Sequence, residues 1–445
     1  MMIKLLIKYQ KSIERQQIMK KTYVIIGLGN RSSLFLNGIF DYREEAELVG
    51  LCDKNAGRLA LKMSWAKGKG FNPKGYSELQ FDQMIKELKP DIVLVSTMDS
   101  THHDYICRAM ELGCDVVTEK PMTTDIEKCK KIFAMQKKTG KNCRVTFNYR
   151  YAPARTQVKQ MLLDGVIGEV LSIDFNWMLN TDHGADYFRR WHRNKINSGG
   201  LMVHKSTHHF DLVNWWINST PKKVYASGAR KFYTPENGDK LGLTNRSERC
   251  FDCPDKKKCP FFFDISKAEF HRTAYLECEK HDGYIRDQCI FSSKIDIEDI
   301  MNVAVEYQNG VQMSYSLNAF CGWEGYQISF NGTKGRLEHK CQESVYVSGE
   351  GKVEGESMKN GTFTRVFPIK ASPYNVEIWE AKGGHGGGDV LLQKDLFSLE
   401  KPADPFALRA NHISGAKSIL TGIAANLSMK ENRPIFVSEF GLTLE

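Results

Sequence analysis

The sequence predicts an α/β protein with two domains, the first built on a parallel sheet and the second on a mixed or antiparallel sheet. Over residues 21–146, short β-branched strands alternate with amphipathic helical stretches, which is typical of a parallel sheet covered on both faces. Beyond this range strands follow one another directly, and Asn309-Gly310 favours a hairpin with a primed turn. We therefore assign residues 147–445 to a second domain and residues 1–20 to an N-terminal extension.

Apolar runs and the turn residues between them set the expected elements. In the first domain we expect strands at Tyr23–Ile26, Glu47–Cys52, Asp91–Thr97 and Asp115–Thr118, and helices at Asp104–Leu112 and Asp125–Thr139. In the second domain we expect a helix at Ala154–Leu163, a strand at Val170–Phe175, a hairpin over Val303–Tyr315 and a tight return at Asn331–Gly335. The first set predicts βαβ units, and the second predicts antiparallel neighbours.

The composition is that of a folded protein without a nucleic-acid or membrane partner. Hydrophobic residues make up 41% of the 445 positions and charged residues 26%, which suffices for two cores. The net charge of +9 is spread out, with no run denser than Lys256-Lys257-Lys258 and no basic stripe with interleaved aromatics. No stretch reaches the roughly 18 apolar residues of a membrane span, and residues 1–20 lack a signal-peptide pattern. We expect a cytoplasmic protein.

A glycine turn after the first strand predicts a dinucleotide site. Gly27 permits a tight turn, Gly29 lets the backbone approach a pyrophosphate, and Ser32 replaces the third glycine. Asp53 ends the next strand, where a carboxylate accepts hydrogen bonds from an adenosine ribose and repels a 2′-phosphate. The cofactor expected is NAD, while Lys54 is compatible with NADP. An ordinary glycine turn is the alternative reading.

The Glu119-Lys120-Pro121 segment follows a strand of the parallel sheet, so it lies at the edge where open α/β folds bind ligands. Pro121, which can be cis, restricts Lys120 to extended geometry and aims its side chain into the site. A surface lysine at a strand end is the alternative. His102, after the preceding strand, is a candidate to line the nicotinamide site or to form a local cap.

A second group of polar residues lies in an apolar helical stretch behind Gly199-Gly200. On one helix, His204, His208 and Asp211 stand at i, i+4 and i+7 and share a face, with Lys205 beside them. Imidazole can accept a hydroxyl proton near neutral pH, so this face suits acid/base chemistry. A zinc pair and buried core histidines are the alternatives.

Together these residues resemble the Gfo/Idh/MocA family, which includes glucose-fructose oxidoreductase, inositol dehydrogenase and a rhizopine catabolism protein. The resemblance covers nearly the whole chain after residue 20 and rests on Gly27-Leu28-Gly29, Asp53, Thr97 to His102, Glu119-Lys120-Pro121, Asn148 to Tyr151, and Gly199-Gly200 with His208 and Asp211. It implies a Rossmann domain and a second α/β domain with a large, mostly antiparallel open sheet. A homodimer or homotetramer through that sheet is also implied.

The resemblance implies hydride transfer between NAD(P) and a sugar, cyclitol or glycoside hydroxyl carbon. Lys120 would bond the reacting hydroxyl and His208 would act as acid/base, with Lys205 and His204 as further catalytic candidates. The cofactor residues would be Gly27, Gly29, Asn30, Arg31, Ser32, Asp53, Thr97, His102, Glu119, Lys120 and Asn148. The substrate residues would be Tyr149, Arg150, Asp211 and His385.

Two positions depart from the family pattern. The family often carries Asp four residues before the catalytic histidine, where this chain has His204. It also often carries Pro-Asn after the strand threonine, where this chain has Met98-Asp99. The proton relay is therefore expected to differ from that of the family.

Four cysteines suggest a metal site within a polar insert at residues 249–290. Cys250, Cys253 and Cys259 are closely spaced, and Cys289 is our choice of a fourth ligand over Cys278. Four thiolates would hold a structural zinc ion with no open position for substrate. An iron–sulfur cluster and unligated reduced thiols are the alternatives.

A glycine-rich segment at residues 383–389 contains His385, a candidate second acid/base or substrate ligand. It resembles a Gly-His-Gly-Gly stretch in the NAD-dependent glycoside hydrolases of the same superfamily; a flexible loop is the alternative. The sequence therefore leaves three functions open: a sugar or cyclitol dehydrogenase, our first choice, a glycosidase that recycles bound NAD, and a non-catalytic nucleotide-bound sugar sensor.

Overall fold

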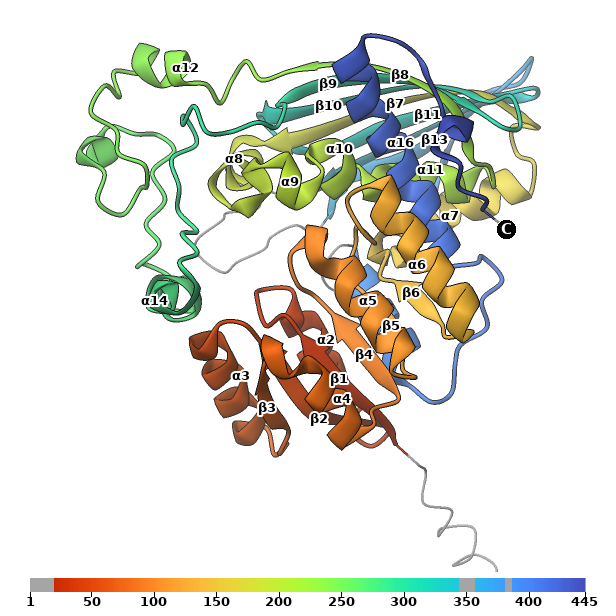
Figure 1. Cartoon of the computed structure of the whole chain (residues 1–445). Helices are drawn as coiled ribbons and strands as arrows, with labels where there is room; N and C mark the ends of the chain where they lie inside the picture. Colours follow the sequence, from red (N-terminus) through yellow and green to blue (C-terminus); the bar gives the residue numbers. More distant parts are fainter. Residues whose placement is uncertain (1–19, 344–356, 381–385, 445) are drawn as a thin grey trace, which may run out of the picture.

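A computed structural model describes residues 20–343, 357–380 and 386–444. Two sheets organise the chain, a seven-stranded sheet in the first domain and a nine-stranded sheet in the second. Helices cover both faces of the first sheet, and a layer of helices separates it from the second (Figure 1). The predicted fold class, a Rossmann domain plus an α/β domain with a large, mostly antiparallel sheet, is confirmed.

The first sheet has the strand order β15-β6-β5-β4-β1-β2-β3. Its strands are β1 (Lys21–Ile26), β2 (Ala46–Asp53), β3 (Lys74–Ser77), β4 (Ile92–Val95), β5 (Asp115–Thr118), β6 (Cys143–Val145) and the antiparallel β15 (Ala410–Asn411). Its helices are α2 (Ser32–Asp41), α3 (Ala56–Gly68), α4 (Phe81–Leu88), α5 (His102–Glu111) and α6 (Ile126–Thr139). In the parallel register Ile26 lies opposite Cys52 and Val95, so the glycine turn, Asp53 and the β4 end meet at one edge.

The second sheet has the order β14-β13-β12-β11-β7-β10-β9-β8-β16. Its strands are β7 (Val170–Asn180), β8 (Pro221–Ala229), β9 (Ile300–Tyr307), β10 (Gln312–Cys321), β11 (Glu324–Gly332), β12 (Gly335–Glu343), β13 (Ser357–Pro368), β14 (Tyr374–Val376) and β16 (Ile435–Phe436). Only β7 and β10 pair in parallel. The β9–β10 hairpin is confirmed, but its turn is not of the primed kind expected, because Gly310 has a positive φ of 87° and Asn309 does not.

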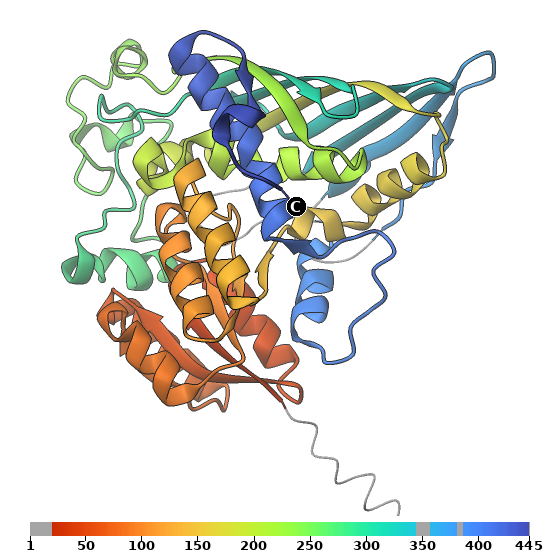
Figure 2. The ribbon, with the colours of Figure 1, turned by 45° about the vertical axis from the view of Figure 1, so that its right-hand side comes forward.

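Helices of the second domain lie on the face of its sheet that looks toward the first domain (Figure 2). They are α7 (Pro153–Leu163), α8 (Thr181–Arg189), α9 (Lys195–Ser198), α10 (Leu201–His204), α11 (Thr207–Trp216) and α16 (His412–Glu431). The segment between β8 and β9 carries α12 (Pro235–Lys240), α13 (Glu269–His271) and α14 (Glu279–Asp282), and α15 (Gly388–Phe397) packs into the core of the first domain through Leu392 and Phe397. Short 3-10 or π turns include η2 (Asp99–Thr101), η3 (Asn148–Tyr151), η5 (Pro254–Lys257) and η6 (Arg272–Leu276). Side chains of this helical layer therefore face the cofactor edge of the first sheet.

The long helix α16 joins the two domains. Ala416 and Ile419 belong to the core of the first domain, while Leu420 and Ala424 belong to that of the second. At Gly422 a Cβ atom would lie 2.2 Å from the carbonyl oxygen of Met202, so a glycine is needed for α16 to approach α10. This close contact fixes α10, and with it His204, relative to the first sheet.

The cysteine-containing insert leaves the second sheet between β8 and β9 and reaches the first domain. In Figure 1 its helix α14 lies beside α3, which follows Asp53. A small apolar cluster lies within it, made of Cys250, Phe263, Ile265, Ala274 and Tyr275. The insert therefore spans from the second sheet to the adenosine side of the predicted dinucleotide site.

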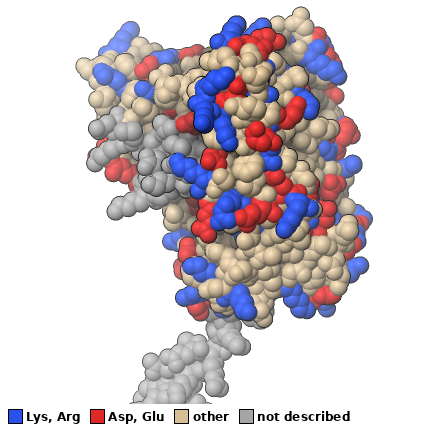
Figure 3. All heavy atoms as spheres, turned by 90° about the vertical axis from the view of Figure 1, so that its left-hand side faces the viewer, with Lys and Arg blue, Asp and Glu red and all other residues tan. Residues whose placement is uncertain are grey.

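The described helices include none with the length and apolar character of a membrane span. On the face drawn in Figure 3, Lys and Arg side chains are interspersed with Asp and Glu rather than gathered in a single basic stripe. Location in the cell and oligomeric state stay predictions.

Candidate active site

The glycine turn after β1 is closely packed against the neighbouring strand. Gly27 has a φ of 86°, and a Cβ there would lie 2.6 Å from the backbone of Ser96 and Thr97. The Ser96 hydroxyl donates to the Gly27 carbonyl at 2.7 Å. A Cβ at Gly29 would instead meet only the Tyr275 hydroxyl, at 3.6 Å. Gly27 is thus required by the fold, whereas Gly29 leaves room above the turn.

Asp53 anchors this turn from β2. Its carboxylate accepts hydrogen bonds from the backbone N–H of Leu28 at 2.5 Å and of Asn55 at 2.6 Å. Ser32 begins α2 and its hydroxyl donates to the Gly29 carbonyl at 2.7 Å. The small residue in the third motif position therefore closes the turn, and the combined geometry fits a dinucleotide cradle.

Arg31 and Asn148 lie near each other through a shared partner, Asp389 at the start of α15. Asn148 Nδ2 donates to Asp389 Oδ1 at 2.7 Å, and Arg31 lies 3.7 Å from the same carboxylate. Arg31 Nε also donates to Glu119 at 2.7 Å. Asn148 is fully buried, and its Oδ1 has no hydrogen-bond partner within the described part of the chain. An unsatisfied buried amide oxygen is consistent with a missing donor from a ligand.

Lys120 follows β5 through the cis Lys120-Pro121 bond that the sequence allowed for. Its Nζ donates to the His204 carbonyl across the domain boundary at 3.3 Å. Burial lowers the pKa of Lys120 to about 8, although the charge of Asp99 opposes this shift. An ammonium group with such a pKa can lose its proton near physiological pH.

His102 connects the strand end to this proline. Its Nδ1 lies 2.8 Å from the Pro121 carbonyl oxygen and its Nε2 3.2 Å from that of Thr97. Burial lowers its pKa. Both ring nitrogens thus face backbone oxygens, which favours a positioning role for His102.

Asp99 and His204 form a contact that sequence reasoning missed. His204 Nδ1 lies 2.5 Å from Asp99 Oδ2, and both residues are buried. Burial raises the pKa of Asp99 and lowers that of His204, so it favours the neutral form of each side chain. These are the two positions at which the chain departs from its family pattern. The sequence signal for this contact was that both positions depart from the family pattern.

The expectation of one helix carrying His204, His208 and Asp211 on a shared face is wrong. The helical stretch is interrupted between α10 and α11, where the Ser206 N–H donates back to the Leu201 carbonyl at 2.9 Å. The Ser206 hydroxyl lies 2.9 Å from the Tyr315 hydroxyl of the sheet, which fixes the interruption. As a result the three side chains point to three different partners.

His208 stacks on Tyr149, with ring centroids 4.1 Å apart and an interplanar angle of 15°. Lys205 donates to the Tyr149 hydroxyl at 3.4 Å and lies 5.0 Å above the Trp177 ring. Burial lowers the pKa of Lys205 and raises that of Tyr149. Tyr149 therefore joins the predicted acid/base residue and a second buried lysine in one group.

Arg150 and Asp211 are bonded to each other. Two guanidinium nitrogens donate to the two carboxylate oxygens at 2.7 and 2.6 Å, and a third contact reaches the Ala407 carbonyl at 3.0 Å. Both side chains are buried. This pairing favours support of the helix below His208 over direct contact with substrate.

His192 is a further buried residue that the sequence did not single out. It stacks on Trp191 with centroids 3.6 Å apart, and its ring lies 4.2 Å from that of His204. Burial lowers its pKa well below the usual value. Nothing in its local sequence distinguishes it from a surface histidine.

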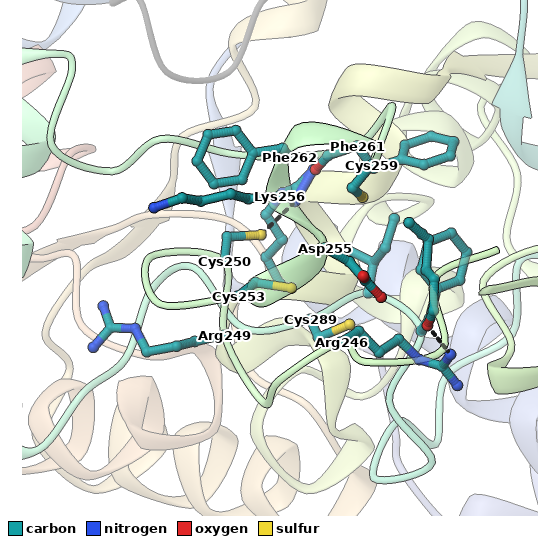
Figure 4. A pocket seen from close by; sticks show the side chains of 14 residues that line it. Arg246, Arg249, Cys250, Cys253, Asp255, Lys256, Cys259, Phe261, Phe262 and Cys289 are labelled. Atoms are coloured by element: carbon teal, nitrogen blue, oxygen red, sulfur yellow. Dashed lines mark hydrogen bonds between the residues drawn. The ribbon is translucent and has the colours of Figure 1, made fainter. Parts of the chain in front are cut away.

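The predicted metal ligands lie together, although no metal centre is formed. Cys250, Cys253, Cys259 and Cys289 line one pocket, where their sulfurs face a common space (Figure 4). Across residues 20–343, 357–380 and 386–444, no three His, Cys, Asp or Glu side chains are close enough to hold an ion. Neither His204 nor His208, considered as a zinc pair, belongs to a group of three such side chains within the described residues. His385 lies outside the described residues.

Comparison of the sequence with protein-family models shows which family the chain belongs to. A model described as an oxidoreductase family NAD-binding Rossmann fold matches residues 21–147, and one described as the C-terminal alpha/beta domain of the same family matches residues 159–437. The chain belongs to the Gfo/Idh/MocA oxidoreductase family. Its glycine turn and Asp53 thus lie in the part matched by the NAD-binding model.

Three similar proteins match this chain over different lengths. YteT of Bacillus subtilis, named as an oxidoreductase, is 37% identical over 432 residues, which cover 94% of this chain and 98% of YteT. The D-glucoside 3-dehydrogenase of Escherichia coli is 30% identical over 219 residues, 49% of this chain and 60% of that enzyme. The structure of the WlbA dehydrogenase of Bordetella pertussis, in complex with NADH and UDP-GlcNAcA, has a TM-score of 0.61 and 17% identity, covering 94% of this chain and 98% of WlbA.

Proposed function

We propose that this protein is an NAD-dependent dehydrogenase that acts on a hydroxyl-bearing carbon of a sugar, cyclitol or glycoside. The observation that carries the proposal is the convergence, at the edge holding the glycine turn, of Lys120 from the first domain with Lys205 and the His208–Tyr149 stack from the second. Proton-transfer groups beside a dinucleotide cradle suit alcohol oxidation or its reverse.

The residues present fit the cofactor. Gly27 and Gly29 make the cradle, and Asp53 lies where an adenosine ribose is bound in this fold. The Asn148 Oδ1 is a buried acceptor with no hydrogen-bond donor among the described residues. A carboxylate at the ribose favours NAD over NADP. When bound, the nicotinamide would accept or return a hydride.

In this proposal Lys120 hydrogen-bonds the reacting hydroxyl oxygen through Nζ and stabilises negative charge that develops there. His208 removes the hydroxyl proton during oxidation and returns it during reduction. Tyr149 orients the His208 ring by stacking, and Lys205 holds the Tyr149 hydroxyl. Arg150 holds the middle of α11 through Asp211.

The sharpest test follows NADH absorbance while purified protein is offered free sugars, polyols and aryl glycosides. The proposal expects NADH formation in equal amount to oxidised product, abolished in Lys120→Ala and His208→Ala. Lys130→Ala is a matched control, since Lys130 pairs with Glu127 on the exposed face of α6. Aglycone release without net NADH would instead establish the glycosidase, and NAD binding without turnover of any compound would establish the sensor.

A further inference from the structure

Four cysteines of the insert, Cys250, Cys253, Cys259 and Cys289, line one small pocket. The pocket has a volume of about 20 Å³, and about 10–15 Å³ holds one water. Its cysteines come from both ends of the insert, brought together where the Cys250 N–H donates to the Asp287 carbonyl at 2.8 Å and the Cys289 N–H to the Glu248 carbonyl at 2.9 Å. Four thiols from the two ends of the insert thus border one small space.

Hydrogen-bond donors and one cation lie around the sulfurs, although burial raises the pKa of the Cys250, Cys259 and Cys289 thiols. Backbone N–H groups of Phe263, Phe261 and Phe291 donate to the sulfurs of Cys250, Cys259 and Cys289. An Arg189 guanidinium nitrogen lies 4.0 Å from the Cys250 sulfur. N–H donors and a nearby cation lower the cost of negative charge on sulfur, as they do around metal-bound cysteines.

The apolar cluster of the insert connects the cysteine pocket to the dinucleotide site. Cys250 packs with Phe263 and Tyr275, and the Tyr275 hydroxyl accepts a hydrogen bond at 3.1 Å from the N–H of Asn30 in the glycine turn. That N–H lies at the entry to α2, where a dinucleotide pyrophosphate is bound in this fold.

Two more contacts hold the insert to the segment behind Asp53. Asn55 Nδ2 donates to the Cys278 carbonyl at 2.9 Å, and Arg58 donates to the Asp282 carboxylate at 2.5 Å. A Cβ at Gly57 would lie 2.5 Å from the Cys278 sulfur, which indicates how tightly the two segments pack. The insert therefore covers the adenosine side of the glycine turn.

We propose that Cys250, Cys253, Cys259 and Cys289 bind one Zn²⁺ as thiolates, and that this structural ion holds the insert with Tyr275 over the cofactor's adenosine half. Zn²⁺ prefers four sulfur ligands in structural sites. The thiols release their protons on binding, and the four sulfurs move inward from their places around the pocket. The apolar cluster of the insert is small, so the ion supplies stability that packing does not. The metal does not depend on the proposed dehydrogenase activity, whereas its effect on NAD does.

The first measurement is the zinc and iron content of the full-length protein purified without chelator. We expect one zinc per chain, lost in Cys253→Ser and Cys289→Ser and kept in Cys321→Ser, a control at the end of β10. Three results would each overturn the zinc site. They are iron found together with labile sulfide, a protein mass four hydrogens lower because two disulfides have formed, and four reactive thiols in a protein without metal. If the serine variants fail to fold, chelator titration of the native protein, read by zinc release and Tm, gives the same decision.

The second measurement is the Kd for NAD. Zinc removal should weaken NAD binding about tenfold or more, with recovery when zinc is returned, and Tyr275→Phe should weaken it while keeping zinc. Unchanged affinity after full zinc loss would overturn the link to the cofactor. Absence of NAD binding by the zinc-loaded protein would overturn the proposed function instead, and the zinc content would still decide the metal site.

Discussion

Asp99 in the first domain and His204 in the second are hydrogen-bonded across the domain boundary, with Oδ2 and Nδ1 2.5 Å apart. Neither residue is typical at its position in the family the chain resembles, where an asparagine often stands at the first and an aspartate at the second. Since the His204 carbonyl also accepts from Lys120, the pair positions the candidate catalytic lysine.

Exchange of the two residues tests this relationship. Asp99→Asn and His204→Asp should each lower kcat by about 10²-fold, because a small misplacement of Lys120 is costly. The double variant places a carboxylate opposite an amide again and should recover much of the loss. A double-mutant cycle on kcat/KM measures the coupling, and additive losses would contradict it.

The pH profile should report the ionisation of Lys120. Its pKa is lowered to about 8, so the ammonium form that bonds the substrate hydroxyl is lost as pH rises through that value. We expect kcat/KM for oxidation to fall on the alkaline side near pH 8. In Lys120→Arg the remaining activity should be lower but flat in this range, because arginine stays protonated. The same alkaline fall in both proteins would assign it to another group.

The two glycines of the turn should respond differently to alanine. Gly27→Ala should lower the free energy of unfolding, since the added Cβ would lie 2.6 Å from backbone atoms and φ is positive. Gly29→Ala should leave stability nearly unchanged, because its Cβ meets only the Tyr275 hydroxyl at 3.6 Å, yet weaken NAD binding. Urea unfolding and NAD titration separate the two effects. Equal loss of stability in both variants would contradict this account.

The Arg150–Asp211 pair is predicted to act through stability. Asp211→Ala leaves a buried guanidinium without its carboxylate and should cost about 3–5 kcal/mol of unfolding free energy. Glu306→Ala, a control that removes a carboxylate paired with two exposed lysines, should change stability little. Chemical denaturation of both variants makes the comparison. An unchanged midpoint for Asp211→Ala would show that the pair does not support α11.

The first domain could be predicted closely because its signals are local. The observed α6, at Ile126–Thr139, begins one residue after the expected start and ends where expected, since Asp125 caps its N-terminus and Gly140 ends it in a left-handed conformation. The glycine turn and Asp53 also depend on neighbours in sequence. Local chemistry was sufficient there.

The active site could be predicted only in part because its geometry depends on long-range contacts. The interruption between α10 and α11 follows from Ser206 meeting Tyr315, which lies 109 positions away. The Asp99–His204 contact spans 105 positions, and Tyr275 reaches the glycine turn across 245. No helical periodicity or local motif encodes such contacts.

Deuterium transfer tests the central claim most directly. A substrate identified by NADH formation is labelled with deuterium on the carbon that bears the reacting hydroxyl, and the nucleotide is analysed by mass spectrometry and NMR. The account predicts one deuterium at C4 of the nicotinamide for each molecule oxidised, and none with His208→Ala or Lys120→Ala. Oxidised product with unlabelled NADH would contradict it.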